Sequence, residues 1–195
     1  MHMPSIVNRT ARHKSGRGRI ETRFFAGSSS KMCSMLDKIK TKEDLMKILP
    51  IRRTQGRRIV FTNGCFDLLH IGHVRYLQAA HDMGDILIVG VNTDASVQAL
   101  SKGNGRPIVP QAQRAEVLAA LACVDYVVLF DESDPGQLIA DLQPDVLVKG
   151  GDWKPEQIIG RESVEARGGI VRTIPLVPDV STTSLVDKIR KDVHR

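Results

Sequence analysis

The stretch Ile59-Val-Phe-Thr-Asn-Gly-Cys-Phe-Asp-Leu-Leu-His70-Ile-Gly-His73 joins a short apolar run to the start of an amphipathic segment. Apolar side chains then return every three or four residues as far as Ala80, which is the spacing of one helix face. The pattern predicts a strand, a turn and then a helix over residues 72–83. This succession is the building unit of an α/β fold with a parallel sheet.

Two imidazoles flank a glycine at the predicted start of this helix. The first N–H groups of a helix lack partners within it, and that helix end carries a partial positive charge. His70 and His73 can add donors to a phosphate oxygen, and Gly72 lets a ligand approach the backbone closely. We therefore predict a phosphate site here. The alternatives are a helix cap with a packed side chain, or a zinc pair, for which Cys65 is the nearest further ligand.

Size and composition indicate one domain with a substantial core. The chain has 195 residues, of which 42% are hydrophobic, and its three scattered cysteines predict no disulfide framework. Free thiols are typical of the reducing cytoplasm, where we place the protein. Apolar runs stay well short of the roughly 20 residues that a membrane-spanning helix needs, so no membrane association is expected.

The positive charge is concentrated at the N-terminus. Residues 1–33 hold seven basic side chains against Glu21 alone, which accounts for the whole formal net charge of +6. The remaining body is electrically balanced and offers no basic surface for a nucleic acid. We expect residues 1–33 to be a disordered basic extension. Alternatives are a transit peptide, or an upstream extension that precedes a start at Met32 or Met35.

Residues 34–57 read as a helical lead-in, in which Thr41 and Asp44 form a capping signal, and Pro50 with the basic stretch through Arg58 ends the helix. Residues 58–195 form the main domain. Its strands are almost continuous apolar runs, which predicts a Rossmann-like, doubly wound parallel sheet with ligands at the carboxyl ends of the strands. The expected strands cover 59–62, 86–91, 126–130, 146–148 and 170–174, and the expected helices cover 72–83, 93–100, 111–121, 135–142, 162–166 and 184–191.

Two loops at this sheet edge carry polar groups. The loop from Lys102 to Arg106 holds two cations between glycines and could close on a phosphate, or it is an ordinary solvated loop. At the end of the fourth strand, Gly151 permits close approach of a ligand, and Asp152 can accept hydrogen bonds from a ribose or a base. The alternative for this second loop is a tight turn with a solvated carboxylate.

A run of hydroxyls opens the last helix. One hydroxyl among Ser181, Thr182, Thr183 and Ser184 serves as the N-cap, and the others with free helix N–H groups predict a second anion site. Asp67 either positions an oxygen near the reaction or caps the turn. The residues suggest neither a Ser-His-Asp triad nor a carboxylate cage for a metal. We therefore expect direct in-line transfer at phosphorus, with Mg²⁺ held mainly by substrate phosphates.

These motifs resemble those of a known superfamily. His70-Ile-Gly-His73 resembles the HxGH signature of nucleotidylyltransferases, and Ser181-Thr-Thr-Ser184 resembles half of their ISTTS-type signature. More narrowly, residues 58–191 resemble D-glycero-β-D-manno-heptose 1-phosphate adenylyltransferases. The segments that carry this narrower likeness are Thr62–His70, Val91–Ser96, Arg106-Pro107, Val148–Trp153 and Ser181–Thr183.

The resemblance implies transfer of AMP from ATP to heptose 1-phosphate, giving pyrophosphate and ADP-heptose for the lipopolysaccharide core or another surface glycan. It implies catalytic roles for His70, His73 and Lys102. The nucleotide-binding residues that it implies, without a protein-bound metal, are Asn63, Gly64, Phe66, Asp67, Gly72, Asn92, Arg106, Gly151, Asp152, Ser181, Thr182 and Thr183.

Some relatives carry a fused sugar kinase, for which this length leaves no room, so we expect a separate kinase. Apolar positions in 36–49 could serve a homo-oligomer, or they could equally pack onto the same domain. One rival is glycerol-3-phosphate cytidylyltransferase, but that family has an Arg-Thr pair where this chain has Leu176–Val180. The other is a non-catalytic nucleotide-binding module, against which the intact histidines and Lys102 argue.

Overall fold

The computed structural model describes residues 35–100, 105–151, 153–178 and 180–193. Its centre is a five-stranded, entirely parallel sheet in the order β3-β2-β1-β4-β5. The predicted Rossmann-like α/β class is therefore confirmed. The strands are β1 (Ile59–Gly64), β2 (Ile86–Asn92), β3 (Tyr126–Phe130), β4 (Val146–Gly150) and β5 (Ile170–Ile174). The helices are α2 (Lys42–Thr54), α3 (Ile71–His81), α4 (Asp94–Ala99), α5 (Gln111–Ala119), α6 (Gly136–Leu142), the 3-10 turn η1 (Pro155–Gln157), α7 (Arg161–Glu165) and α8 (Thr182–Val193).

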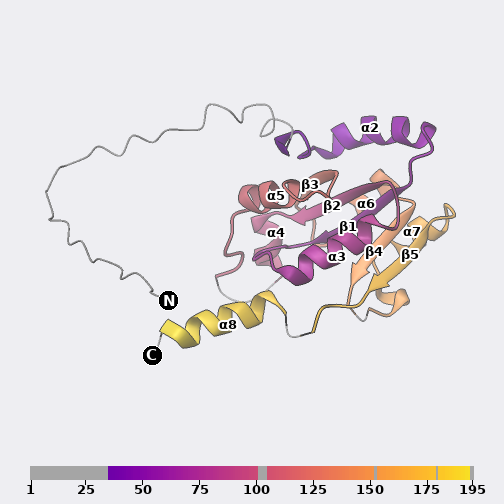
Figure 1. Cartoon of the computed structure of the whole chain (residues 1–195). Helices are drawn as coiled ribbons and strands as arrows, with labels where there is room; N and C mark the ends of the chain where they lie inside the picture. Colours follow the sequence, from indigo (N-terminus) through magenta and orange to yellow (C-terminus); the bar gives the residue numbers. More distant parts are fainter. Residues whose placement is uncertain (1–34, 101–104, 152, 179, 194–195) are drawn as a thin grey trace, which may run out of the picture.

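Alternate side chains of each central strand enter two separate cores. In β1, Val60 packs with α3 and α5, whereas Ile59 and Phe61 pack with α2, α6 and α7 on the other face. Strands of Val, Ile and Leu suit a sheet that is covered on both sides, because both faces are removed from water. Figure 1 shows these helices around the sheet, with α8 in yellow outside them.

Three strands, β1, β2 and β4, run further than predicted toward the expected ligand edge. The ladder between β1 and β2 continues through Asn63 and Gly64, and the ladder between β4 and β5 continues through Lys149 and Gly150. Polar and glycine residues end the apolar runs, so hydrophobicity alone placed these strand ends too early. The extension puts Asn63 and Lys149 on regular strands.

The lead-in forms the helix α2, which contains a proline. Thr41 caps α2 as predicted, and its Oγ1 accepts a hydrogen bond of 3.1 Å from the Asp44 N–H. The helix passes through Pro50 and ends at Thr54, within the stretch from Pro50 to Arg58 that was predicted to end it. A proline inside a helix costs about 3 kcal/mol. Burial of Leu45 and Leu49 offsets this cost, since each buried leucine contributes about 1.5–3 kcal/mol.

The lead-in is also tied to the main body by polar contacts. Arg53 Nη2 donates to the carbonyls of Leu142 at 2.5 Å and Gln143 at 2.7 Å, at the end of α6. Lys38 Nζ donates to the carbonyls of Leu121 at 3.1 Å and Val124 at 2.7 Å. These bonds satisfy carbonyls that a helix end or turn leaves open.

Two further expectations concern the N-terminal extension and membrane-spanning helices. The predicted disorder of residues 1–33 lies outside the described residues. Within the described part of the chain, no helix is long and apolar enough to cross a membrane.

The burial pattern of α2 yields a stability prediction. Leu49→Ala should lower the free energy of unfolding by about 2–5 kcal/mol, because it leaves a cavity between α2 and α6. The matched control is Met46→Ala on the exposed side of the same helix, which should change it by less than about 0.5 kcal/mol. Urea denaturation measures both, and equal small effects would show that α2 is not part of the core.

Candidate active site

The carboxyl ends of the strands border a cleft of about 560 Å³. The first turn of α3 and the start of α8 both line it, as predicted from the two motifs. The predicted site residues on its wall are Asn63, Gly64, Phe66, His70, Gly72, His73, Asn92, Ser181 and Thr182. The structure adds Lys149 and Tyr76, a loop from Ser133 to Pro135, and apolar side chains that include Trp153 and Leu176.

The two imidazoles stack at the start of α3. Their ring centroids are 3.8 Å apart and their planes differ by 23°. His70 occupies the N-cap position, but its side chain makes no capping hydrogen bond. The Nδ1 atoms of His70 and His73 are buried without a hydrogen-bond partner among the described residues. The cap alternative therefore does not account for these rings, and buried polar atoms of this kind normally have a partner.

Both imidazoles are held in their neutral form. Burial, followed by the charge of His70, lowers the pKa of His73 to about 4. Burial also lowers the pKa of His70. At neutral pH the pair therefore offers N–H dipoles to an anion, and the formal positive charge must come from elsewhere.

Gly72 has a packing role as well as the predicted role in ligand approach. A Cβ at this position would lie 3.0 Å from both Cε1 and Nδ1 of His70. A larger residue would require the His70 ring, which stacks on His73, to shift by a few tenths of an ångström. The HxGH spacing thus sets the geometry of the imidazoles as well as the opening at the helix end.

The hydroxyls at the start of α8 have two roles: some cap the helix, and one contacts a neighbouring loop. Ser181 Oγ accepts from the Ser184 N–H at 3.0 Å, and Ser184 Oγ accepts from the Ser181 N–H at 3.1 Å. Ser181 is the N-cap, as predicted for one hydroxyl of the run, and the reciprocal bond engages a second hydroxyl, that of Ser184. Thr182 Oγ1 donates to the carbonyl of Leu68 at 3.4 Å, which joins the start of α8 to the loop before His70.

Three further predicted residues, Asp67, Arg106 and Thr183, line an adjoining hollow of about 440 Å³. This hollow shares Phe66, His73 and Thr182 with the cleft. Asp67 accepts hydrogen bonds from Arg106 Nη1 at 2.6 Å, from the Ile108 N–H at 2.8 Å and from the Val109 N–H at 2.9 Å. Burial opposes ionisation of Asp67, but these hydrogen bonds lower its pKa overall. Asp67 and Arg106 therefore fix the segment that enters α5.

Sequence reasoning missed Arg114, which is 1% exposed. Its guanidinium donates to the carbonyls of Val109 at 2.9 Å, Asn92 at 2.8 Å and Cys65, and it forms an ion pair of 2.7 Å with Asp94. Arg114 thereby joins the ends of β1 and β2, which carry the site. A single arginine in a helical pattern reads as solvent-facing, so the sequence gives no signal for this role.

Two predicted residues, Lys102 and Asp152, lie outside the described residues. Gly151 has φ +101°, which an L side chain adopts only with strain, so it serves the turn after β4. Within the ranges that the structure describes, no three His, Cys, Asp or Glu side chains are grouped to hold a metal. That Mg²⁺ is carried by substrate phosphates stays a prediction.

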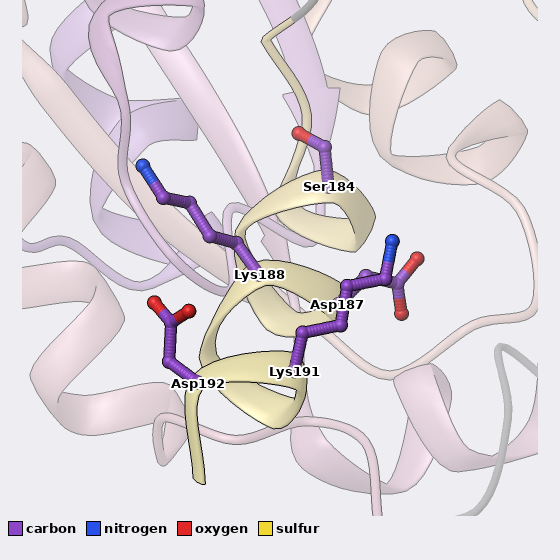
Figure 2. A pocket seen from close by; sticks show the side chains of 5 residues that line it. All are labelled: Ser184, Asp187, Lys188, Lys191 and Asp192. Atoms are coloured by element: carbon purple, nitrogen blue, oxygen red, sulfur yellow. The ribbon is translucent and has the colours of Figure 1, made fainter. Parts of the chain in front are cut away.

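A second, shallow hollow lies along α8. It is lined by Ser184, Asp187, Lys188, Lys191 and Asp192, which recur at the spacing of helix turns (Figure 2). Charges of both signs alternate there, as on a solvent-facing helix surface. This hollow shares no residue with the cleft.

Comparison with known proteins agrees with this geometry. A family model described as cytidylyltransferase-like matches residues 61–188, from β1 into α8. The chain belongs to the cytidylyltransferase-like family. Its members are nucleotidyltransferase-type enzymes, as the HxGH motif predicted.

Two similar curated proteins are both named bifunctional protein HldE. The chain is 56% identical over 153 residues to the bifunctional protein HldE of Geotalea uraniireducens, covering 78% of this chain and 31% of that protein. It is 52% identical over 152 residues to the HldE of Syntrophotalea carbinolica, again covering 78% and 31%. This cytidylyltransferase-like chain thus spans about a third of the length of these relatives.

Solved structures share the fold. A lipopolysaccharide core biosynthesis protein from Thermoplasma volcanium is 27% identical with a TM-score of 0.51, over 63% of this chain and 98% of that protein. Pantothenate synthetase from Thermus thermophilus is 16% identical with a TM-score of 0.55, over 80% and 70%, and this likeness concerns the fold alone.

The depressed pKa of His73 predicts a pH-dependent stability. Between pH 6.5 and about 4 the unfolded chain protonates this imidazole and the folded chain does not. The free energy of unfolding should therefore fall as the pH is lowered through this window, by at most about 1.4 kcal/mol per pH unit for one proton. Above pH 7 the contribution is constant.

Urea denaturation at pH 7, 6 and 5 measures this dependence. In His73→Gln the free energy of unfolding should fall less steeply with decreasing pH than in the unmodified chain. The variant lacks the imidazole that takes up a proton when the chain unfolds. His81→Gln, at the far end of α3 and outside the cleft, is the matched control. Equal slopes for His73→Gln and the unmodified chain would contradict the buried neutral state.

Proposed function

We propose that this protein transfers the adenylyl group of ATP to D-glycero-β-D-manno-heptose 1-phosphate, giving ADP-heptose and pyrophosphate. The observation that carries the proposal is the stacked pair of imidazoles of His70 and His73 at the start of α3, which line a cleft shared with the start of α8. Similarity above 50% to HldE proteins supports the choice of this reaction within the family.

The proposed reaction is a single displacement. An oxygen of the sugar phosphate attacks the α-phosphorus of ATP and forms a new P–O bond. The bond from this phosphorus to the oxygen bridging to the β-phosphate breaks, and pyrophosphate leaves with that electron pair. Catalysis by placement and electrostatics suffices for such a step.

The position of each residue in the cleft determines its role in the proposed reaction. His70, His73 and the free N–H groups of α3 donate to the β- and γ-phosphates and stabilise the charge that develops on pyrophosphate. Ser181 and Thr182 bring the start of α8 to the same cleft. Mg²⁺ bound by the phosphates would supply further neutralisation of charge. The nucleotide contacts of Asn63, Gly64, Phe66 and Asn92, and the contribution of Lys102, belong to this proposal.

The proposed reaction depends on a source of the sugar 1-phosphate and on a compartment that contains ATP. A sugar 1-phosphate must be made by a phosphorylating enzyme before this step, and the separate kinase stays a prediction. We place the reaction in the cytoplasm, where ATP is available. Assembly into a homo-oligomer also stays a prediction.

The reaction can be tested directly. The purified protein with ATP, Mg²⁺ and heptose 1-phosphate should release pyrophosphate in proportion to ADP-heptose, as followed by a coupled pyrophosphate assay and mass spectrometry. CTP with glycerol 3-phosphate is the rival pair, because the family is cytidylyltransferase-like. Turnover of the rival pair alone would move the chain to that specificity, and nucleotide binding without any turnover would favour a binding module.

The imidazoles should be required for turnover. His70→Ala and His73→Ala should each lower kcat by roughly 10²-fold or more, because each removes a preorganised donor to a charged transition state. His81→Ala is the control on the same helix. Near-normal kcat in both cleft variants would reject the roles assigned to the pair.

A further inference from the structure

Lys149 lies at the end of β4 and lines the cleft, and the sequence motifs give it no role. Its Nζ donates to Asn63 Oδ1 at 2.6 Å, across the neighbouring strands β1 and β4. Both side chains are half-buried and line the cleft. The bond fixes the end of a flexible side chain at the floor of the cleft.

Strand alternation places this pair on one side of the sheet. Phe61 and Leu147 pack in the core that α6 covers, and Asn63 and Lys149 follow them by two residues on the same face. The residues between them face the other way, since Thr62 Oγ1 forms a hydrogen bond of 2.6 Å with Tyr76 of α3. The cleft therefore has an α3 side with the imidazoles and an α6 side with Lys149.

Charge distinguishes the two sides. Among the described residues that line the cleft, Lys149 is the only lysine or arginine. The imidazoles are neutral dipoles at neutral pH, and Arg106 is engaged by Asp67 in the adjoining hollow. ATP and a sugar phosphate would together bring four phosphate groups to this cleft. Because these groups repel one another, we expect a cation near the binding position of each substrate.

The stereochemistry of displacement assigns a side to each substrate. The attacking oxygen must arrive opposite the leaving pyrophosphate, which the proposed function places at the start of α3. The acceptor phosphate then approaches from the α6 side, where Lys149 and the Ser133–Pro135 loop line the cleft. An ammonium there offsets the repulsion between the acceptor and the triphosphate and orients the attacking oxygen.

We propose that Lys149, aimed by Asn63, binds the phosphate of the acceptor sugar. This inference rests on the proposed function for the identity of the acceptor. It gives Asn63 a positioning role toward Lys149 in addition to the nucleotide contact implied by the motif.

Direct binding measurements can test it. Lys149→Met keeps the length of the side chain and removes its charge, and Lys47→Met on the exposed side of α2 is the matched control. Isothermal titration is performed with heptose 1-phosphate and, separately, with ATP. Lys149→Met should weaken binding of heptose 1-phosphate by about 10- to 100-fold, as expected for a lost charged hydrogen bond. Binding of ATP should change by less than about threefold.

Kinetics supply a second readout. The KM for heptose 1-phosphate should rise in Lys149→Met while the KM for ATP stays near its original value, and Lys149→Arg should restore part of the affinity. If Lys149→Met does not fold, Lys149→Gln replaces it, because an amide can still donate to Asn63. A loss confined to ATP, or unchanged affinity for both ligands, would overturn the inference.

The titrations separate this inference from the proposed function. If the unmodified protein binds heptose 1-phosphate through Lys149 but releases no pyrophosphate, the proposed reaction fails and the binding assignment stands. If pyrophosphate is released at the same KM by Lys149→Met and the unmodified protein, the reaction stands and the assignment of Lys149 fails.

Discussion

The hydroxyl of Tyr76 fixes the position on which the rest of the site depends. It lies 2.6 Å from Thr62 Oγ1 of β1 and donates to the carbonyl of Val148 of β4 at 3.2 Å. Burial raises its pKa to about 12, so the group stays protonated and able to donate. Because Tyr76 belongs to α3, these two bonds hold the helix that carries the imidazoles against the strands that carry Asn63 and Lys149. Donors on both sides of the cleft are thereby placed relative to one another before any ligand binds.

Buried polar groups surround the site, and the pairing of Arg114 and Asp67 shapes the sheet edge. Arg114 is almost wholly buried and bonds to backbone at the ends of β1 and β2, while Asp67 holds the backbone that enters α5. Leaving such groups unpaired costs about 1–3 kcal/mol each. The Nδ1 atoms of His70 and His73 stand apart from this pattern among the described residues. The same two imidazoles line the cleft, so the part of the sheet edge that lacks internal hydrogen bonds is the part next to the proposed ligand site.

The sequence predicts the elements well and the polar pairings poorly. Apolar runs located all five strands, and the local HxGH and Ser-Thr-Thr patterns located both helix ends, because these signals lie within a few residues of one another. The bonds from Arg106 to Asp67, Arg114 to Cys65 and Lys149 to Asn63 join residues 39, 49 and 86 positions apart. Such pairs arise only when the sheet brings strand ends together. The continuation of α2 through Pro50 likewise depends on tertiary burial, which local propensity does not contain.

The two helix ends that meet in the cleft differ in how firmly the protein holds them. α3 buries Tyr76, Leu77 and Ala80 against the sheet, whereas none of the described side chains of α8 is fully buried. The start of α8 is joined to the loop before His70 by the Thr182 hydroxyl, and Ile189 further along is 59% exposed. Elements with few buried apolar contacts open at lower free energy than core elements. A triphosphate that bridges both helix ends would therefore stabilise α8 more than α3, so the α3 side supplies the preorganised half of the site and the α8 side completes it when the nucleotide binds.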